Sequence, residues 1–333
     1  MLPPGRRAAA YTGAMRWLVA LLGVLLLAGC SVISLDLTPR IRPLEEETVE
    51  GHGDAKILLM DVSGFLSDET PSGVLTIGTP PPRVPMLVRL REELKKAAED
   101  SKVRAIVVRI NSPGGTVTAS DIMFRELDNF KRSSGIPIVA SMMDVAASGG
   151  YYVALAADTI VAHPTTVTGS IGVIMLTLNA EGLMQKVGLA AAAIKSGERK
   201  DMGSPFRQLT PEERAIFQTV IDDLHRQFVA KLVDRRKIPQ AAAATLADGR
   251  IYTAEQALGL KLIDAIGYVP DALAAARRAA GLEEARVVVY KRPREYRATY
   301  YARSEAEGGA FTTLSQLAGL AGAGPKFLFL WAP

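Results

Sequence analysis

One stretch decides the fold: residues 103–115, which read VRAIVVRINSPGG. Its first eight residues, 103–110, are mostly apolar and β-branched, which is typical of a strand buried on both faces of a parallel sheet. The next five, Asn111 to Gly115, are predicted to turn, and their glycines allow another backbone to approach closely. A helix is then expected over residues 118–131, opened by a capping box from Thr118 to Asp121. This succession predicts an accessible turn at the carboxyl edge of the sheet, where α/β proteins bind ligands.

The alternation of strand and helix continues on both sides of this stretch. Further strands are expected over residues 57–62, 137–142, 159–162 and 172–176, and further helices over residues 85–100 and 148–157. Apolar strands separated by helices predict an α/β fold with a mostly parallel sheet. After residue 200 the chain becomes more helical, and Thr210-Pro211-Glu212-Glu213 is a well-specified helix start. The stripe behind this start is expected to be core: Phe217, Ile221, Leu224, Phe228 and Leu232.

The N-terminal residues predict an export signal. Residues 1–29 have a basic start, an apolar run over residues 17–27 and a small-residue end, the order of a secretory signal. The last residues, Leu27-Ala28-Gly29-Cys30, match a bacterial lipobox, in which the cysteine is diacylated and becomes the new first residue. The apolar run is shorter than the ~20 residues of a spanning helix, which argues against a transmembrane anchor. We therefore expect lipidation at Cys30, with either Met1 or Met15 as the start.

A lipidated Cys30 predicts a protein anchored to the outer face of the cell membrane or in the periplasm, and Ser31 is compatible with outer-membrane sorting. The whole chain has 39 basic and 35 acidic side chains. Removal of residues 1–29 takes away three arginines and no acidic side chains, so the mature chain has a formal charge of +1. Such a small excess indicates no nucleic-acid partner.

The rest of the chain divides into three expected parts. Residues 30–54 are polar and acidic and are expected to be a tether. Residues 55–292 carry the strand–helix pattern and are expected to be the folded domain. Residues 293–333 lose the pattern and are expected to be a loosely ordered tail. Cys30 is the only cysteine, so no disulfide can form within the chain.

A serine in an unusual setting is the first candidate for chemistry. Ser148 lies in AASGGYY (residues 146–152), at the start of a predicted helix. There the Gly149 amide and the positive helix end could stabilise an oxyanion. The alternative is an ordinary N-cap serine, which is common. Two adjacent glycines cost a helix about 1 kcal/mol each, which favours a function for them.

A serine hydroxyl becomes a good nucleophile only when a base takes its proton. None of the three histidines has a local setting that suggests this role. A lysine can act instead once burial disfavours its charged form. Lys200 in KSGERKD (residues 195–201) is the candidate, although charge alone does not distinguish it from Lys195 and Arg199.

Four motifs, in this order, resemble the signal peptide peptidase A family, and residues 248–253 with 257–264 resemble its later signature. The four are Asn111-Ser112-Pro113-Gly114-Gly115, Ala147-Ser148-Gly149-Gly150-Tyr151-Tyr152, Thr168-Gly169-Ser170-Ile171-Gly172-Val173 and Lys195-Ser196-Gly197-Glu198-Arg199-Lys200-Asp201. The similarity covers about residues 55–292. It implies the Clp-protease/crotonase-like fold: repeated ββα units, a mostly parallel sheet core and a helical C-terminal part.

The resemblance implies roles for these residues. Ser148 would be the nucleophile and Lys200 its general base, 52 residues later. Gly149, with Gly114 or Gly115, would form the oxyanion hole. Ser170 would orient the lysine amine. The implied activity is a membrane-associated endopeptidase that cleaves remnant signal peptides and other unfolded apolar peptides through an acyl-enzyme, without metal or cofactor.

The chain departs from the long form of this family, in which two tandem copies divide the lysine and the serine between them. Only one copy is present, so we expect a homo-oligomeric ring in which Ser148 of one subunit meets Lys200 of its neighbour. In one protomer the two side chains should then lie beyond the reach for general-base action, about 2.6–3.2 Å.

Two other classes share this fold: a crotonase-type acyl-CoA enzyme and a non-catalytic membrane scaffold. Neither would need Lys200. For the peptidase, an extended peptide is expected to bind by adding a strand, with small and aliphatic side chains preferred. The chain's own tail, residues 314–330, has a similar composition and could compete for the groove.

Overall fold

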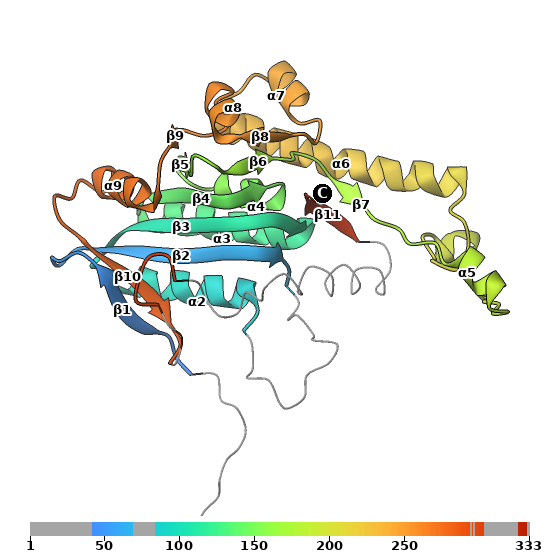
Figure 1. Ribbon diagram of the computed structural model, residues 1–333, viewed down its shortest axis with the longest axis horizontal. Coiled ribbons are helices and arrows are strands. Elements are labelled where there is room, and N and C mark those ends of the chain that lie inside the picture. Colours follow the sequence, from blue (N-terminus) through green and yellow to red (C-terminus); the bar gives the residue numbers. More distant parts are fainter. Residues whose placement is uncertain (1–41, 69–83, 294, 296, 303–325, 332–333) are drawn as a thin grey trace, which may run out of the picture. The chain divides into compact units, whose positions relative to one another are not determined.

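The computed structural model describes residues 42–68, 84–293, 295, 297–302 and 326–331 (Figure 1). Its strands are β1 (Glu45–Glu50), β2 (Lys56–Leu66), β3 (Val103–Thr116), β4 (Ile138–Ala147), β5 (Thr159–Ala162), β6 (Val167–Gly169), β7 (Ile174–Met175), β8 (Ile251–Thr253), β9 (Ala265–Ile266), β10 (Arg286–Lys291) and β11 (Phe327–Leu330). Its helices are α2 (Met86–Glu99), α3 (Val117–Ser134), α4 (Gly149–Ala154), α5 (Glu181–Lys186), α6 (Pro211–Arg236), α7 (Gln240–Leu246), α8 (Ala254–Gly259), α9 (Val269–Ala279) and the short 3-10 helix η2 (Glu198–Asp201).

The sheet is mostly parallel, as predicted. Its strand order is β1-β10-β2-β3-β4-β5-β9, and every pair from β10 to β9 is parallel. β1 pairs antiparallel with β10, β8 with β6, and β11 with both β3 and β7. The α/β fold class expected from the sequence is therefore confirmed, and the antiparallel strands lie at its margins.

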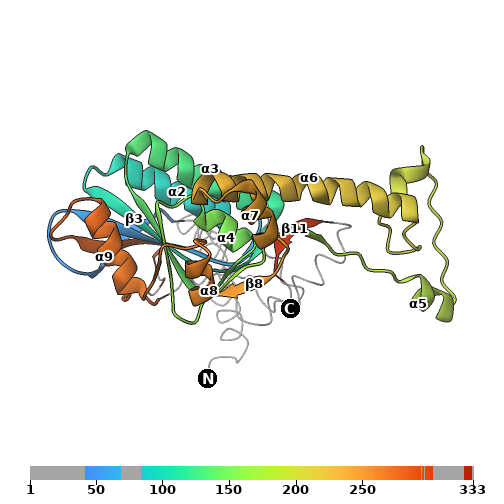
Figure 2. The ribbon, with the colours of Figure 1, turned by 90° about the horizontal axis from the view of Figure 1, so that it is seen from above.

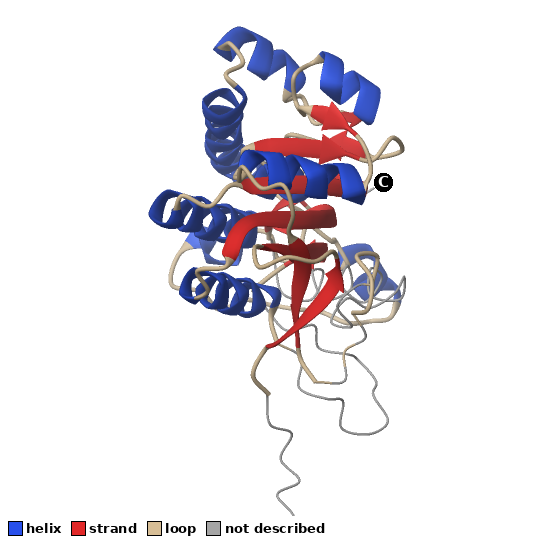
Figure 3. Cartoon of the chain, turned by 90° about the vertical axis from the view of Figure 1, so that its left-hand side faces the viewer, coloured by secondary structure: helices blue, strands red, loops and turns tan. Residues whose placement is uncertain are grey.

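Both faces of the sheet are covered, which explains the near-continuous apolar strands. Leu58 and Met60 of β2 face a core shared with α2, α3, α4 and α6, whereas Ile57 and Leu59 face a second core under α9. Figure 2 shows α2 and α3 on one side of the sheet and α9 on the other, and Figure 3 shows helices beside the layer of strands. Burying each such side chain contributes about 1.5–3 kcal/mol.

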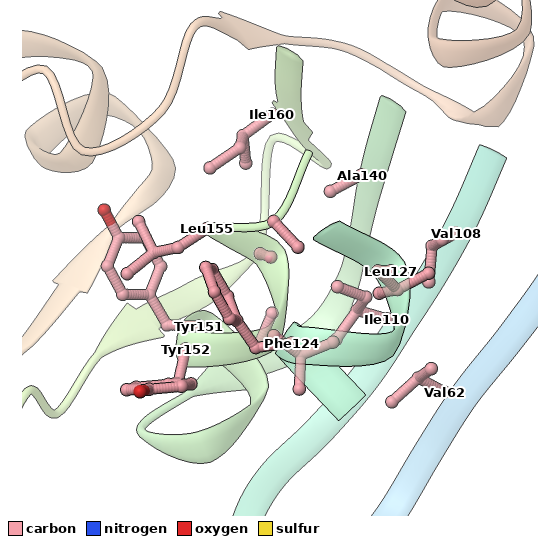
Figure 4. Packing of buried hydrophobic residues seen from close by; sticks show 14 of the residues in the cluster. Val62, Val108, Ile110, Phe124, Leu127, Ala140, Tyr151, Tyr152, Leu155 and Ile160 are labelled. Carbon is pink, nitrogen blue, oxygen red and sulfur yellow. The ribbon is translucent and has the colours of Figure 1, made fainter. Parts of the chain in front are cut away.

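The larger core joins the strands to the helices that carry the candidate site. Figure 4 shows Val108 and Ile110 of β3 close to Leu127 of α3, with Tyr151 and Tyr152 of α4 beside them. Tyr151 is fully buried, and its hydroxyl donates to the Leu262 carbonyl at 2.8 Å. The start of α4 is thereby held by packing on the same core as the sheet.

The predicted start of α6 is confirmed. Thr210 caps the helix, and Glu213 completes a capping box with Pro211 in the first turn. The expected stripe is confirmed in part: Phe217, Phe228 and Leu232 are buried, whereas Ile221 and Leu224 are half-buried. α6 therefore packs on the core along only part of its length.

Two predictions around residues 111–121 were wrong. The segment Asn111–Gly115 is not a turn, because β3 continues through it to Thr116, paired with β2 on one side and β11 on the other. The cap of α3 is Thr116, whose hydroxyl accepts from the Ala119 amide at 3.2 Å, and not Thr118. Because β3 runs directly into α3 with no turn between them, the cap lies two residues earlier than predicted.

The expected tether and tail also need correction. Glu45–Glu50, placed in the tether, form strand β1. Phe327–Leu330, placed in the loose tail, form the partly buried strand β11. Cys30 and residues 1–29 lie outside the described residues, as does most of the tail. Within the described ranges, no helix has the length and apolarity to cross a membrane.

The buried Glu93 of α2 should make the stability of the folded chain depend on pH. Burial raises the pKa of this carboxyl to about 7, although Arg89 lies 3.6 Å away. The folded chain therefore holds a proton that the unfolded chain releases, so stability falls as pH rises towards 7. Glu93→Gln, which stays neutral, should flatten the decline in Tm between pH 5 and 8, whereas the exposed Glu99→Gln should not. Parallel Tm profiles for wild type and Glu93→Gln would contradict this.

Candidate active site

Ser148 lies at the junction between β4 and α4 in a strained conformation. Its φ is 50° and its ψ is −115°, a region that non-glycine residues rarely adopt. Such a backbone costs about 1–3 kcal/mol and persists only where its surroundings enforce it. Here the Ser148 amide donates to the Gly169 carbonyl at 2.7 Å, and its carbonyl accepts from Tyr152 at 2.9 Å. Strain of this kind concentrates at functional sites.

The Ser148 hydroxyl is buried and unsatisfied. The residue is 1% exposed, and its Oγ has no hydrogen-bond partner among the described residues. It does not cap α4, so the ordinary N-cap alternative is wrong. A buried polar atom without a partner is rare and costs about 1–3 kcal/mol. None of the three histidines bonds to this hydroxyl, so its expected base must come from elsewhere.

The two glycines after Ser148 have a packing role. A Cβ on Gly150 would lie 2.6 Å from the Ser112 carbonyl oxygen, and one on Gly149 would lie 2.4 Å from Ser120 Oγ. Glycine therefore lets α4 press directly on β3 and α3. The same closeness brings the Gly149 amide next to Gly114, because a Cβ on Gly114 would lie 2.8 Å from the Gly149 nitrogen. The structure thus brings together Ser148, Gly149 and Gly114.

The structure favours one of the two alternative oxyanion donors. The Gly114 amide already donates to Ser112 Oγ at 3.0 Å, and Ser112 Oγ donates to the Gly64 carbonyl at 2.6 Å. The Gly115 amide is therefore the better partner for Gly149. The sequence quoted Ser112 only as part of a motif and gave no signal that its hydroxyl would engage Gly114.

Ser170 lies one residue beyond Gly169, whose carbonyl accepts from the Ser148 amide. It follows β6, which pairs with β4 so that Gly169 lies opposite Ala147. Ser170 is 7% exposed with a φ of 49°, and its amide donates to the Arg250 carbonyl at 2.7 Å. Ser148 and Ser170, both with a positive φ, therefore each come directly after the end of one of two neighbouring strands, β4 and β6.

Lys200 is not brought to Ser148 within the protomer. It lies in η2, fully on the surface, and no described residue bonds to its amine or pairs with it. Figures 1 and 2 both show α5, which precedes it, at the far end of α6 from the sheet. The expected separation of serine and lysine in one protomer agrees with the unpartnered Ser148 hydroxyl.

The lysine motif itself distinguishes Lys200 from Lys195. Lys195 pairs with Asp201 at 2.6 Å, and Arg207 bridges Asp201 at 2.8 Å and Glu213 at 2.5 Å. The hydrogen bonds from Arg207 and Lys195 hold the pKa of Asp201 well below its usual range. Lys195 is therefore committed to a local network that shapes the loop, whereas Lys200 is available to another partner.

Comparisons with known proteins identify the family of this chain. The model of peptidase family S49 matches residues 130–283, which contain Ser148, Ser170 and Lys200. A protein of Enterococcus faecium, provisionally named signal peptide peptidase SppA, is 36% identical over 247 residues, 74% of this chain and 70% of that protein. A provisionally named protease of Synechocystis is 43% identical over 192 residues, 58% of this chain and 69% of its own length.

Protease 4 of Salmonella typhi is 35% identical over 192 residues, which are 58% of this chain but 31% of that longer protein. The E. faecium match extends over most of both chains, and the family match spans the strained serine and the lysine loop. The chain therefore belongs to peptidase family S49 and is a serine peptidase of the signal peptide peptidase A type.

Proposed function

We propose that this serine peptidase is a membrane-associated endopeptidase that cleaves remnant signal peptides and other unfolded apolar peptides. One observation supports it above all: Ser148 is strained and buried next to the Gly149 amide, and no described residue bonds to its hydroxyl. Its position at the end of β4, beside the extended edge of β3, suits a peptide bound as an added strand.

The proposed mechanism uses Ser148 and Lys200 in two half-reactions. The neutral Lys200 amine takes the Ser148 proton while Oγ attacks the peptide carbonyl carbon. The Gly149 and Gly115 amides stabilise the oxyanion. The intermediate collapses, the C–N bond breaks, and the departing amine takes the proton from the Lys200 ammonium. Water, deprotonated by the same amine, then attacks the acyl-enzyme and releases the acid and Ser148.

Oligomerisation is part of the proposal, because the site is incomplete in one protomer. Residues 176–210, between β7 and α6, form the arm that carries Lys200. This arm exposes large apolar side chains, among them Leu183 at 65% and Leu189 at 63%. Exposed apolar groups of this kind mark interaction surfaces. A second copy would cover them and present Lys200 to the buried Ser148 hydroxyl.

Membrane attachment through Cys30 completes the proposed function. The lipobox-like Leu27–Cys30 supports an anchor on the outer face of the membrane or in the periplasm. Mass spectrometry of the mature N-terminus should find a diacylated Cys30. An unmodified N-terminus, with Cys30→Ala still in the membrane fraction, would contradict this anchor.

A fluorophosphonate probe tests the proposed chemistry. It should label Ser148 and no other residue, because only an activated serine reacts with it at a useful rate. The same protein, before it is labelled, should cleave a synthetic signal peptide. The Ser148→Ala variant should neither be labelled nor cleave. A crotonase-type enzyme or a scaffold would remain unlabelled. Labelling that persists in Ser148→Ala would rule out the assignment.

A further inference from the structure

The chain's own strand β11 occupies the position that a peptide would take at this site. β11 pairs antiparallel with β3 on one side, with Leu328 opposite Thr116 and Leu330 opposite Gly114. It pairs antiparallel with β7 on the other side, with Leu328 opposite Ile174. Figure 1 shows this strand, in red, between β7 and the end of β3. It fills the edge at which a substrate strand would be added.

One carbonyl of β11 lies against Gly114 and Gly149, beside the candidate oxyanion hole. A Cβ on Gly114 would lie 1.9 Å from the Phe329 oxygen, and one on Gly149 would lie 3.1 Å from it. The Trp331 amide donates to the Pro113 carbonyl at 2.8 Å. The alternation of an antiparallel ladder then makes Phe329 and Gly115 a hydrogen-bonded pair, which directs the Gly115 amide towards this oxygen. The Phe329 carbonyl thus stands where a reacting carbonyl belongs.

The side chains of β11 fit an aromatic surface behind the groove. Phe329 is 2% exposed, and its ring lies 5.2 Å from that of Tyr152 and 4.7 Å from that of Phe228. Tyr152 is fixed in turn by an edge contact with Phe124 at 5.5 Å and by its hydrogen bond to Asp121 (Figure 4). The core would therefore lose a buried aromatic ring if β11 left without a replacement.

We propose that β11 is an intramolecular competitor, which a substrate must displace from the groove before Ser148 can act. This inference rests on the proposed peptidase function and adds a regulation of the same site. Because β11 belongs to the same chain, its local concentration does not fall on dilution. A substrate with a large apolar side chain for the Phe329 position would compete best, since it would restore the contacts with Tyr152 and Phe228.

Kinetics of three variants test the competition. If the groove is free for one tenth of the time, removing β11 lowers KM about tenfold and leaves kcat unchanged. A chain ending at Lys326 should show this full effect, and Phe329→Ala part of it. Leu330→Ala is the matched control, because this half-buried side chain projects from the other face of the strand. Equal KM values for wild type and the chain ending at Lys326 would overturn the proposal.

A binding measurement separates this inference from the proposed function. A fluorescent peptide of residues 325–333 should bind the Ser148→Ala chain that ends at Lys326 at least tenfold more tightly than full-length Ser148→Ala. A peptide with the Phe329→Ala change should bind more weakly. This readout needs no cleavage, so it stands even if the protein cleaves no signal peptide. Absence of binding to the shortened chain, with its fold verified by circular dichroism, would overturn the proposal.

Discussion

Lys200→Ala should abolish peptide cleavage and leave the fold intact. A positioned general base contributes about 10²–10⁴-fold, so kcat/KM should fall by that factor. The Lys200 side chain is exposed and pairs with no described residue, so its truncation removes no stabilising contact. The measurement is kcat/KM on a synthetic signal peptide, together with Tm, which should not change.

Two control variants sharpen this test. Lys200→Arg keeps the positive charge but cannot lose its proton, so it should be as inactive as Lys200→Ala if the residue is a base. Lys195→Ala removes the ion pair with Asp201, which is partly exposed, and exposed ion pairs contribute little to stability. Its activity should fall much less. Activity retained in Lys200→Ala or in Lys200→Arg would exclude Lys200 as the base.

The pH profile follows from the same role. Lys200 accepts a proton only as the neutral amine, so cleavage should rise with pH.

The sequence predicted the parts of the fold that depend on local pattern. Mostly apolar stretches indicated β2, β3 and β4, and the Thr210 cap indicated the start of α6. The misplaced elements are those whose structure depends on distant partners. The sequence placed Glu45–Glu50 in the tether because an edge strand needs few apolar residues to mark it. Its partner β10 lies near the other end of the chain, so no local pattern indicates the pairing. β11 is apolar, and the sequence placed it in the tail because its partners β3 and β7 are distant along the chain.

The candidate site also contains features that the sequence predicted and features that it did not. Ser148 and Gly149 follow β4, which the pattern placed in the sheet, whereas Ser170 follows β6, a strand that the sequence did not predict. The choice between Gly114 and Gly115 was not predictable, because it depends on the hydrogen bond from Gly114 to Ser112 Oγ. The strain at Ser148 and Ser170 was not predictable either, since neither residue type requires a positive φ.

Mixing two inactive variants should restore activity if the dyad is shared between subunits. Ser148→Ala subunits supply an intact lysine, and Lys200→Ala subunits supply an intact serine. In a ring with one repeated head-to-tail interface, each site takes its serine from one subunit and its lysine from the next. Random mixing in equal amounts then makes about a quarter of the sites complete. Peptide cleavage should recover to about that fraction of the wild-type rate.

The control for this experiment is the double variant, Ser148→Ala with Lys200→Ala. Mixed with Lys200→Ala alone it supplies no lysine, so cleavage should stay absent at every ratio. Two different affinity tags, captured in sequence, verify that hetero-oligomers have formed. A dyad within one chain would leave every mixed site with one residue missing. Silence from verified hetero-oligomers would therefore exclude the shared site, and it would require the arm carrying Lys200 to fold back onto Ser148 of its own protomer.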